Sequence, residues 1–377
     1  MYLCYKYKLY PTKEQAKKLE KTLELCCWVY NEILSYRKNA YEKEQKSLNY
    51  YSTIKLLPQW KKDKTELKEV NAQALQNVVM RVDKAFKNFF RRVKKGGENP
   101  GYPRTKETKN YRSFTYPQPK IQGAKLKEDE GLLYLAKIGN IKIKLHRPLQ
   151  GNLRTTTICK KGENWYAYFL CKIDEIAPLP SSEAIGIDLG LTTFAVFSNG
   201  EKIERQRWDE KDKKDIARLQ RKKLRYSKGS KEREKVIKSL EKAYRRASNR
   251  RENFAHQESR KLVNRFGLIV FEKLNIQSMQ RQKISNINRG INDVSWKKFI
   301  SYTVYKAKNM GRSVLLVDPA GTSQICSRCG DKSPKRLSER THRCSSCGLK
   351  MDRDLNAAIN ILGRGLASIG TQPDKDS

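Results

Sequence analysis

Two closely spaced cysteine pairs near the end of the chain constrain its fold more than any other feature. Two residues separate Cys326 from Cys329 and Cys344 from Cys347, fourteen residues separate the two pairs, and a glycine follows each pair directly. The glycines allow backbone N–H groups to approach the sulfur atoms. Four thiolates in two such turns match a tetrahedral structural Zn²⁺ site with no position left open for catalysis. The alternative is two unrelated pairs, one of them redox-active. The spacing predicts a zinc-ribbon insert over residues 323–349.

The remaining cysteines are expected to be plain core residues in a reducing compartment. The opening residues MYLCYK lack the long apolar stretch of a secretory signal, and clustered cysteines in a reducing compartment bind metal more often than they form disulfides. His342 lies two residues before Cys344, but four thiols leave no place for it as a zinc ligand. The other five cysteines fall on apolar strands or helix faces; they are Cys4, Cys26, Cys27, Cys159 and Cys171.

The net charge indicates a polyanionic partner. The 377 residues include 80 Lys and Arg against 40 Asp and Glu, which gives +40. A hydrophobic share of 38% is enough to build a core, so the chain is not a basic disordered tail. The sequence has no run of about 18 apolar residues, so no membrane-spanning helix is expected, and an anionic membrane surface would require an amphipathic basic helix. Nucleic acid is therefore the expected partner.

The first half of the chain divides into a helical part and a strand-rich part. Residues 1–10 alternate like a strand, and Thr12 opens a capping-box sequence at the start of a helix. Apolar residues at helical spacing indicate a mostly helical unit over 11–95. Short strands separated by turn signals over 111–173 indicate a small β-barrel, which the N-terminal strand could complete. Residues 178–182 are typical of a linker.

The second half has the element order of an RNase H-like α/β fold: a strand hairpin, a strand, a helix, a strand and a helix. A basic helical hairpin over 211–262 interrupts this order, and Gly363 onward is expected to form a loose tail. The fold class is therefore a multidomain α+β protein with an RNase H-like domain, an inserted zinc ribbon and an N-terminal β-barrel. The expected elements lie at 184–190, 193–198, 268–272, 295–310, 313–318 and 354–362.

Three acids form the next candidate site. Asp188 and Glu272 each end a buried apolar strand, and Asp354 opens the last helix. Taken singly, Asp354 could be a helix cap and the other two could be strand-end acids paired with lysines. Together, they could converge at one edge of a sheet.

A convergence of these acids would require bound cations. Two carboxylates about 4 Å apart repel by about 4 kcal/mol at an effective dielectric of about 20, so three of them store about 12 kcal/mol. Oxygen-only ligands favour Mg²⁺ or Mn²⁺ over zinc. Two such ions about 3.5–4 Å apart activate water and stabilise the leaving oxygen in phosphodiester hydrolysis. The prediction of a nuclease depends on whether the three acids meet.

The basic hairpin is the least specific signal. Residues 211–250 contain 17 Lys and Arg and five acids, a net charge of +12. Such a helix is often only a solvated face, but beside a phosphodiesterase site its cations would follow a nucleic-acid backbone. The cations expected to do so are Arg221, Lys222, Lys223, Arg225, Arg245, Arg246, Arg250 and Arg251.

Four stretches resemble the TnpB (OrfB) family of insertion-sequence proteins, relatives of the type V CRISPR effectors. They are IGIDLGLTTFAV at 185–196, LIVFEKLNI at 268–276, DPAGTSQICSRCG at 318–330 and HRCSSCGLKMDRDLNAAINIL at 342–362. YKYKLYPTKEQ, VYNEIL and GYPRTK near the N-terminus are similar to the same family's opening. Ala320 and Glu98-Asn99 depart from the family pattern without touching the chemistry.

The resemblance implies roles for particular residues. The family's RuvC-like catalytic acids, which bind Mg²⁺ or Mn²⁺, fall on Asp188, Glu272 and Asp354. Asp354 is preferred to Asp352 because the family motif leaves one residue between the acid and Asn-Ala-Ala. The structural zinc ligands fall on the four paired cysteines.

The resemblance also implies an architecture and an activity. The architecture comprises a wedge β-barrel (1–10 and 101–180), a helical recognition domain (11–100), a RuvC-like nuclease (183–322 and 350–365) and a flexible tail (366–377). The activity is RNA-guided cleavage of double-stranded DNA next to a short motif that the protein reads, with one chain expected per RNA. A prokaryotic cytoplasm, near the nucleoid, is the expected location.

Amide side chains suited to adenine edges occur on one predicted helix, at Asn71, Gln73, Gln76 and Asn77. They are candidates for reading the adjacent motif, and helix capping with surface polarity is the alternative. Two other functions remain open: a direct transposase, for which no separate DNA-end-binding module is evident, and a non-cleaving RNA-guided DNA-binding regulator. A structure-selective resolvase would not need so large a helical insert.

Overall fold

The computed structural model divides into two compact units, Met1–Asp174 and Glu175–Ser377. The structure describes residues 1–96, 100–119, 123–174, 177, 183–206, 208–274, 296–333 and 339–370. The expected linker at 178–182 and the Glu98-Asn99 pair lie outside these ranges. No helix among the described residues is both long and apolar enough to cross a membrane.

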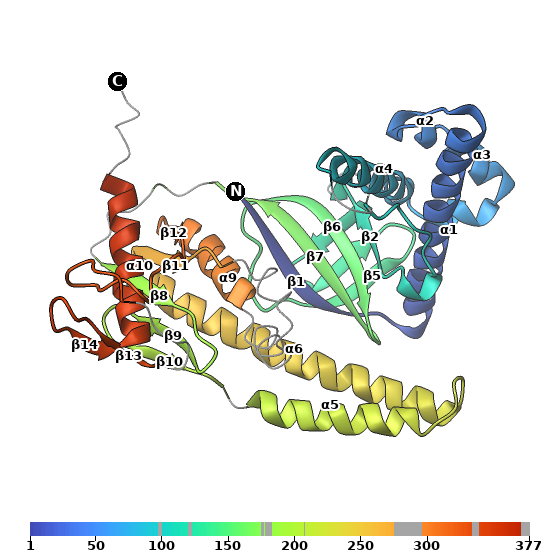
Figure 1. Cartoon of the computed structure of the whole chain (residues 1–377). Helices are drawn as coiled ribbons and strands as arrows, with labels where there is room; N and C mark the ends of the chain where they lie inside the picture. The colour runs from blue at the N-terminus through green and yellow to red at the C-terminus, as the bar shows by residue number, and fades with distance from the viewer. Residues whose placement is uncertain are drawn as a thin grey trace. The chain divides into compact units, whose positions relative to one another are not determined.

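The helices of the first unit follow the sequence pattern (Figure 1). The longest, α1, begins with the predicted capping box: the Gln15 N–H donates to Thr12 Oγ1 at 3.2 Å, and the Thr12 N–H donates to Gln15 Oε1 at 3.0 Å. The apolar stripes of α1 and α4 are buried against each other and the neighbouring sheet. The helical elements are α1 (Lys13–Glu44), α2 (Tyr50–Ile54), α3 (Leu56–Asp63), a 3₁₀ turn (Thr65–Glu69), α4 (Ala72–Lys94) and a second 3₁₀ turn (Thr108–Asn110).

The strands of the first unit form one antiparallel sheet in the order β2-β6-β7-β1-β5-β4-β3. The N-terminal strand lies at its centre, between β7 and β5. The strands are β1 (Tyr2–Tyr10), β2 (Ser113–Tyr116), β3 (Ala124–Lys127), β4 (Leu132–Leu135), β5 (Gly139–Lys144), β6 (Asn152–Lys161) and β7 (Asn164–Lys172).

This sheet curls back on itself. Tyr116 lies on the edge strand β2, yet its hydroxyl donates to the Ala136 carbonyl at 3.3 Å, directly after β4 near the opposite edge. Strands lie about 4.8 Å apart, so in a flat sheet these two strands would be more than 20 Å apart. No pairing joins β2 to β3 among the described residues. The structure therefore shows a strongly curled sheet, and the closed barrel stays an expectation.

The expectation that Cys4 is a core residue is wrong. Cys4 is exposed, because Tyr5, Tyr7 and Leu9 of the same strand point into the core and successive residues of a strand face opposite sides. Of the other four, Cys26, Cys27 and Cys171 are buried, and Cys159 is partly exposed.

The second unit is built on a mixed five-stranded sheet in the order β10-β9-β8-β11-β12. A hairpin joins β8, β9 and β10 in antiparallel pairs, whereas β11 lies parallel to both β8 and β12. This is the element order that the sequence predicted. The strands are β8 (Ala184–Asp188), β9 (Thr193–Phe197), β10 (Lys202–Glu204), β11 (Leu268–Glu272) and β12 (Ser313–Val317).

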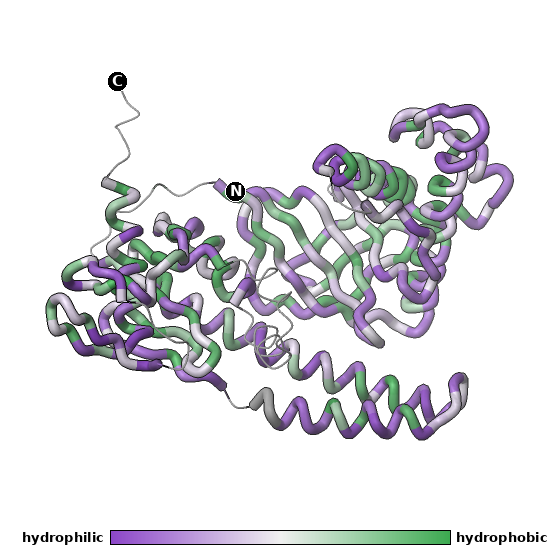
Figure 2. Tube along the Cα trace, viewed as in Figure 1, coloured by the Kyte–Doolittle hydropathy of each residue, from purple (hydrophilic) through white to green (hydrophobic). Residues whose placement is uncertain are grey.

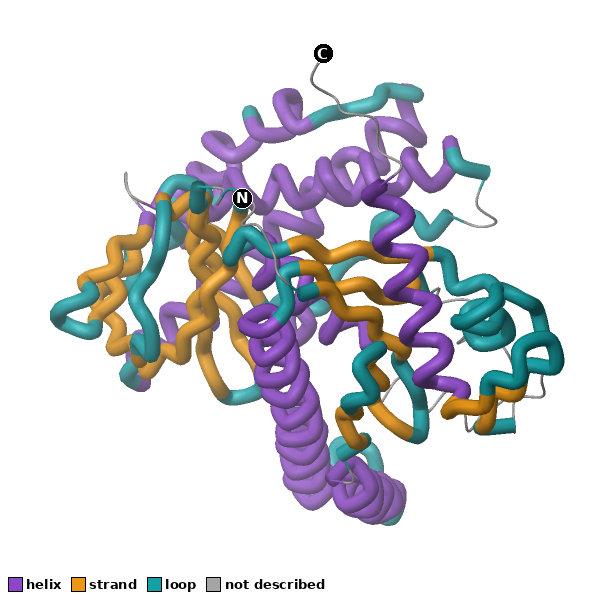
Figure 3. The backbone as a smooth tube through the Cα atoms, turned by 90° about the vertical axis from the view of Figure 1, so that its left-hand side faces the viewer, coloured by secondary structure: helices purple, strands orange, loops and turns teal. Residues whose placement is uncertain are grey.

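The last helix, α10 (Arg353–Gly370), lies across the sheet and contacts β8, β9, β11 and β12 (Figure 3). Two glycines permit this close approach. A Cβ on Gly186 of β8 would lie 2.2 Å from the Ala358 carbonyl oxygen, and one on Gly365 of α10 would lie 2.5 Å from the Val270 side chain. Without those glycines, the helix would have to lie farther from the strands.

The prediction that a loose tail starts at Gly363 is wrong. The helix continues to Gly370, so residues 366–370 of the expected flexible tail are helical. Gly365 lies inside the helix and packs closely against Val270. Residues 371–377 lie outside the described ranges.

The basic hairpin consists of α5 (Trp208–Leu224) and α6 (Lys231–Arg265), which lie side by side. Both helices are hydrophilic over most of their length (Figure 2). Ser230 caps α6 by accepting the N–H of Arg233 at 3.2 Å, at the end of the turn that joins the two helices. The C-terminal half of α6 packs against α9 (Trp296–Lys308).

Candidate functional site

The three predicted acids gather at one edge of the second unit's sheet. Asp188 ends β8 and Glu272 ends β11. Because these strands are parallel neighbours, their carboxyl ends lie at the same edge. Asp354 lies in the first turn of α10, which packs on β8. We call Asp188, Glu272 and Asp354 the acid centre.

The charges of the acid centre act on one another. Burial, the Glu272 carboxylate and the Asp354 carboxylate, in that order, raise the pKa of Asp188 to about 7, against the opposing effect of Arg353. Burial also raises the pKa of Glu272, although the Thr322 hydroxyl and Arg364 oppose the change. The carboxylates of Glu272 and Asp354 are therefore close enough to Asp188 to disfavour its ionisation. A cation placed among them would remove that penalty.

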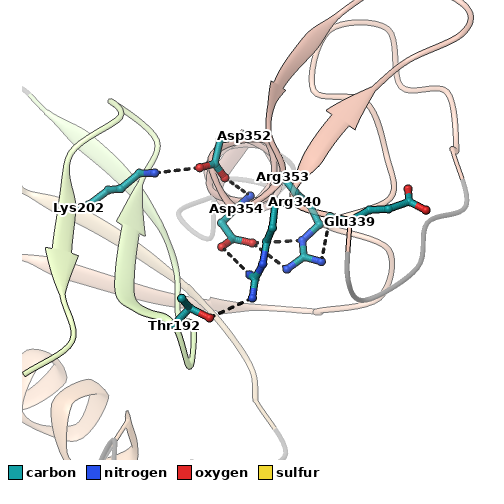
Figure 4. Close-up of polar contacts among 7 residues, drawn as sticks. All are labelled: Thr192, Lys202, Glu339, Arg340, Asp352, Arg353 and Asp354. Atoms are coloured by element: carbon teal, nitrogen blue, oxygen red, sulfur yellow. Dashed lines mark hydrogen bonds and ion pairs between the residues drawn. The ribbon is translucent and has the colours of Figure 1, made fainter. Parts of the chain in front are cut away.

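Two arginines, Arg340 of the zinc-ribbon segment and Arg353 at the start of α10, partly neutralise the third acid (Figure 4). Arg353 donates to Asp354 Oδ1 through Nε at 3.2 Å and through Nη2 at 3.1 Å. Arg340 Nη1 lies 3.4 Å from Asp354 Oδ2, and its Nη2 donates to Thr192 Oγ1 at 3.0 Å. The sequence reasoning missed both arginines. Only the position of Arg353, next to Asp354 in the chain, could have indicated one of them.

Asp352 has a different role from Asp354. Its Oδ1 accepts the Asp354 N–H at 2.8 Å at the start of α10, and its Oδ2 pairs with Lys202 Nζ at 2.8 Å (Figure 4). Burial alone would raise the pKa of Asp352, but the hydrogen bonds from Lys202 and the helix N–H groups lower it. Asp352 is thus the helix cap, and Asp354 is the one of the two whose charge raises the pKa of Asp188.

Glu272 is held by a residue that the sequence reasoning also missed. The Thr322 hydroxyl, which is 4% exposed, makes a short hydrogen bond to Glu272 Oε1. Thr322 lies in the segment GTSQ, between β12 and the first cysteine pair. Nothing in the periodicity of that loop marks it, because the contact depends on how the loop folds over β11.

The acid centre fits divalent metal ions on the chemistry of its donors. It offers three carboxylates and no nitrogen or sulfur, which is the donor set that Mg²⁺ and Mn²⁺ prefer. Burial and the two neighbouring carboxylates both disfavour the ionised form of Asp188, and a divalent ion at this edge would offset both effects.

The four paired cysteines form a second, separate cluster. The Sγ atoms of Cys326, Cys329, Cys344 and Cys347 all lie within 4.8 Å of one another. Two of the sulfur pairs are 3.6 and 3.5 Å apart, whereas a disulfide needs about 2.05 Å. A tetrahedron of sulfurs about 2.3 Å from zinc has edges of about 3.8 Å. The cluster therefore has the size of a four-thiolate zinc site.

The two cysteine turns have the same backbone geometry. The N–H of Cys326 donates to the Asp331 carbonyl at 2.8 Å, and that of Cys344 donates to the Leu349 carbonyl at 2.9 Å. Gly330 and Gly348 have φ of 80° and 71°, the left-handed region that glycine adopts without strain. A short hairpin of β13 (Thr341–Arg343) and β14 (Lys350–Asp352) closes the insert. His342 is buried in β13 and is not part of the sulfur cluster.

The cations predicted on the basic hairpin are not equivalent. Arg250 Nη1 pairs with Asp212 Oδ1 at 3.0 Å, which ties α6 to α5. Arg221, Lys222, Arg225 and Arg246 are exposed, whereas Lys223, Arg245 and Arg251 are partly buried. Arg250 therefore has a structural partner that its sequence context did not reveal.

The predicted amides lie along the start of α4. Asn71 caps the helix by accepting the N–H groups of Gln73 and Ala74 at 2.9 and 3.3 Å. Asn77 accepts from Arg81 Nε at 3.0 Å. Gln76 is exposed, whereas Gln73 is half-buried. Capping therefore accounts for Asn71, and of the four amides only Gln76 is fully exposed.

Three family models match parts of the chain. "Probable transposase", of the OrfB IS605 type, covers residues 168–283, and "Cas12f1-like, TNB domain" covers 296–361. A "Helix-turn-helix domain" model covers 1–46, where the structure has β1 followed by the single helix α1.

Relatives match over nearly the full length. A Streptomyces pristinaespiralis protein named "Putative RNA-guided DNA endonuclease" is 33% identical, over 99% of this chain and 93% of its own. "Putative RNA-guided DNA endonuclease InsQ" of Escherichia coli is 29% identical, over 97% and 92%. The solved structure of a Cas12f1–sgRNA–target DNA complex shares the fold, with a TM-score of 0.62 and 18% identity, over 93% of this chain and 83% of that one. The full-length match at 33% identity establishes that the chain belongs to the TnpB (OrfB, IS605) family of RNA-guided DNA endonucleases, which is related to the Cas12f type V effectors.

Proposed function

We propose that this protein uses an RNA guide to bind double-stranded DNA and cleaves it by metal-dependent phosphodiester hydrolysis at the acid centre. The finer parts of the proposal are a transposon-derived guide, a short adjacent motif read by the protein, two catalytic ions and a RuvC-like nuclease domain. The observation that carries the proposal is the gathering of Asp188, Glu272 and Asp354 at one sheet edge, with a raised pKa at Asp188.

Particular residues have separate roles in this proposed reaction. Asp188, Glu272 and Asp354 would hold Mg²⁺ or Mn²⁺, and these ions would supply an activated water and stabilise the leaving oxygen. Thr322 orients the Glu272 carboxylate, and Asp352 fixes the first turn of α10, which carries Asp354. The four-cysteine cluster would hold a structural Zn²⁺ and keep the ribbon folded beside this edge.

The nucleic-acid partners are assigned from the net charge of the chain and from its structural similarity to Cas12f1. The Cas12f1 structure with the same fold contains a guide RNA and target DNA, and the net charge of +40 requires a polyanion. We assign the exposed cations of the basic hairpin to phosphate contacts. On α4 we assign Gln76 and Asn77 to the adjacent motif ahead of Asn71, whose side chain is used as a cap.

The curled sheet and the helices α1 to α4 fit the proposed wedge and recognition domains. The strand order of the second unit fits a RuvC-like nuclease interrupted by the zinc ribbon. One chain per RNA is the proposed stoichiometry.

The test is incubation of the purified protein–RNA complex with plasmid that matches the guide, in Mg²⁺. Guide-dependent cuts support the proposal. DNA that is bound but intact indicates a non-cleaving regulator, and joined products indicate a transposase. Asp188→Ala should abolish cutting and leave DNA binding unchanged; cutting by that variant refutes the assignment of the acid centre.

A further inference from the structure

We infer that Thr322 is a positioning residue for Glu272 and that it connects the zinc knuckle to the acid centre. The knuckle is the turn 326–330, which carries the first cysteine pair. The inference rests on the proposed function and names a residue outside its three carboxylates. It concerns the loop 318–327, which links β12 to the first cysteine turn.

The first step is the contact itself. The Thr322 hydroxyl donates to Glu272 Oε1, and its second neighbour is the Pro319 carbonyl at 3.2 Å. A carboxylate is a stronger acceptor than a carbonyl, so the Thr322 hydroxyl donates its hydrogen to Glu272 and not to Pro319. With one oxygen fixed in this way, the carboxyl plane of Glu272 is set before any ion arrives. Orientation of this kind is how groups outside the ligand set tune a metal site.

The second step is the rigidity of the loop. Two side chains of α10 hold it through four backbone carbonyls. Arg364 donates to the carbonyls of Asp318 and Ala320 at 2.6 and 2.8 Å. Asn360 Nδ2 donates to the carbonyls of Thr322 and Ile325 at 2.8 and 2.7 Å.

The third step reaches the cysteines. Asn356, fully buried, donates to the Ile325 carbonyl at 2.8 Å and accepts the Ser327 N–H at 3.0 Å. These two residues flank Cys326. Hydrogen bonds therefore join the knuckle to Asn356, Asn360 and the Thr322 carbonyl. The hydroxyl of the same Thr322 then bonds Glu272. Asn356 and Asn360 are one helical turn apart, so they present both amides to the loop from one face of α10.

This arrangement gives the zinc ribbon a role in positioning a catalytic acid. With zinc bound, the knuckle holds Ile325 and Ser327 in place for the α10 amides, and the loop keeps Thr322 against β11. The hydroxyl is specific to the effect. Valine has nearly the same shape but cannot donate, and serine can donate without the methyl group.

The experiment compares Thr322→Val and Thr322→Ser in the protein–RNA complex. The probe is Mn²⁺, followed by its EPR signal, and the complex of Asp188→Asn serves as the blank because RNA also binds Mn²⁺. Thr303→Val is the matched control: Thr303 is also a buried threonine of the second unit, but its hydroxyl donates to the Phe299 carbonyl within α9 at 2.9 Å.

We expect Thr322→Val to weaken site-specific Mn²⁺ binding about 10- to 100-fold, the usual effect of removing a group that orients a ligand. Thr322→Ser should bind nearly as wild type does, Thr303→Val should be unchanged, and all variants should retain one zinc per chain. Wild-type Mn²⁺ affinity in Thr322→Val overturns the inference. So does an equal loss in Val and Ser, or a loss of zinc or RNA along with Mn²⁺ in Thr322→Val. If wild type binds Mn²⁺ at this site but never cuts DNA, the proposed function fails and the inference stands.

Discussion

Replacing Asp188 with asparagine should stabilise the protein when no Mg²⁺ is present. Burial and the neighbouring carboxylates raise the pKa of Asp188 from its ordinary value of 3.8 to about 7. The folded state therefore binds the Asp188 proton more tightly than the unfolded chain does. Stability falls as the pH rises through this window, and the full penalty is present above pH 7. At about 1.36 kcal/mol per pKa unit, the penalty is about 4 kcal/mol at pH 8 and less than half of that at pH 5.

The assay is thermal unfolding followed by circular dichroism, with zinc retained and no other divalent ion. A gain of about 4 kcal/mol corresponds to about 10 °C in Tm for a unit of this size. The gain should shrink at pH 5, and Mg²⁺ at pH 8 should raise the Tm of wild type but not that of Asp188→Asn. Glu204→Gln removes one exposed negative charge from the same unit and is the control. Equal melting of Asp188→Asn and wild type at pH 8 would show that the carboxylates do not repel one another as argued.

Three further predictions follow from the site. Cys344→Ser should lower the bound zinc from one per chain to near none, measured by elemental analysis, because three thiolates and a hydroxyl hold zinc poorly; retained zinc would contradict the four-thiolate site. Asp352→Ala should cost about 1 kcal/mol of stability through the lost helix cap and should still bind metal. Asp354→Ala should lose metal binding, and calorimetric Mn²⁺ titration distinguishes the two variants. Mn²⁺ binding lost in Asp352→Ala and kept in Asp354→Ala would exchange the roles of the two acids. Arg246→Gln should make the log–log salt slope of DNA binding shallower by about 0.9. Arg250→Gln should instead lower the Tm, because it leaves the buried carboxylate of Asp212 without its ion pair. Equal salt slopes for Arg246→Gln and wild type would show that Arg246 does not contact phosphate.

Local sequence patterns predicted helix starts, turns and strand ends well where a few neighbouring residues determine the backbone conformation. The capping box at Thr12 and the glycines after each cysteine pair needed only neighbouring residues to act. The ends of β8 and β11 followed from apolar runs that stop at an acid. Because parallel strands align their carboxyl ends, two of the three acids could be expected to meet without any knowledge of the loops.

Long-range packing explains what the sequence did not predict. Thr322 and Arg340 reach the acid centre only because α10 lies against the strands, and that approach depends on Gly186 and Gly365. The end of α10 was expected at Leu362, with a loose tail from Gly363, because nothing in the local sequence shows that Gly365 packs against Val270. Cys4 was expected in the core because it lies on an apolar strand, although the alternation of β1 places it on the exposed face.

Cleavage of a plasmid that matches the copurified RNA, compared between wild type and Asp188→Asn in Mg²⁺, tests the central claim most directly. The account predicts linear product from wild type, no product from the variant, and equal DNA binding by both. Cutting by the variant, or a wild-type complex that binds the matched plasmid and leaves it intact, would contradict it.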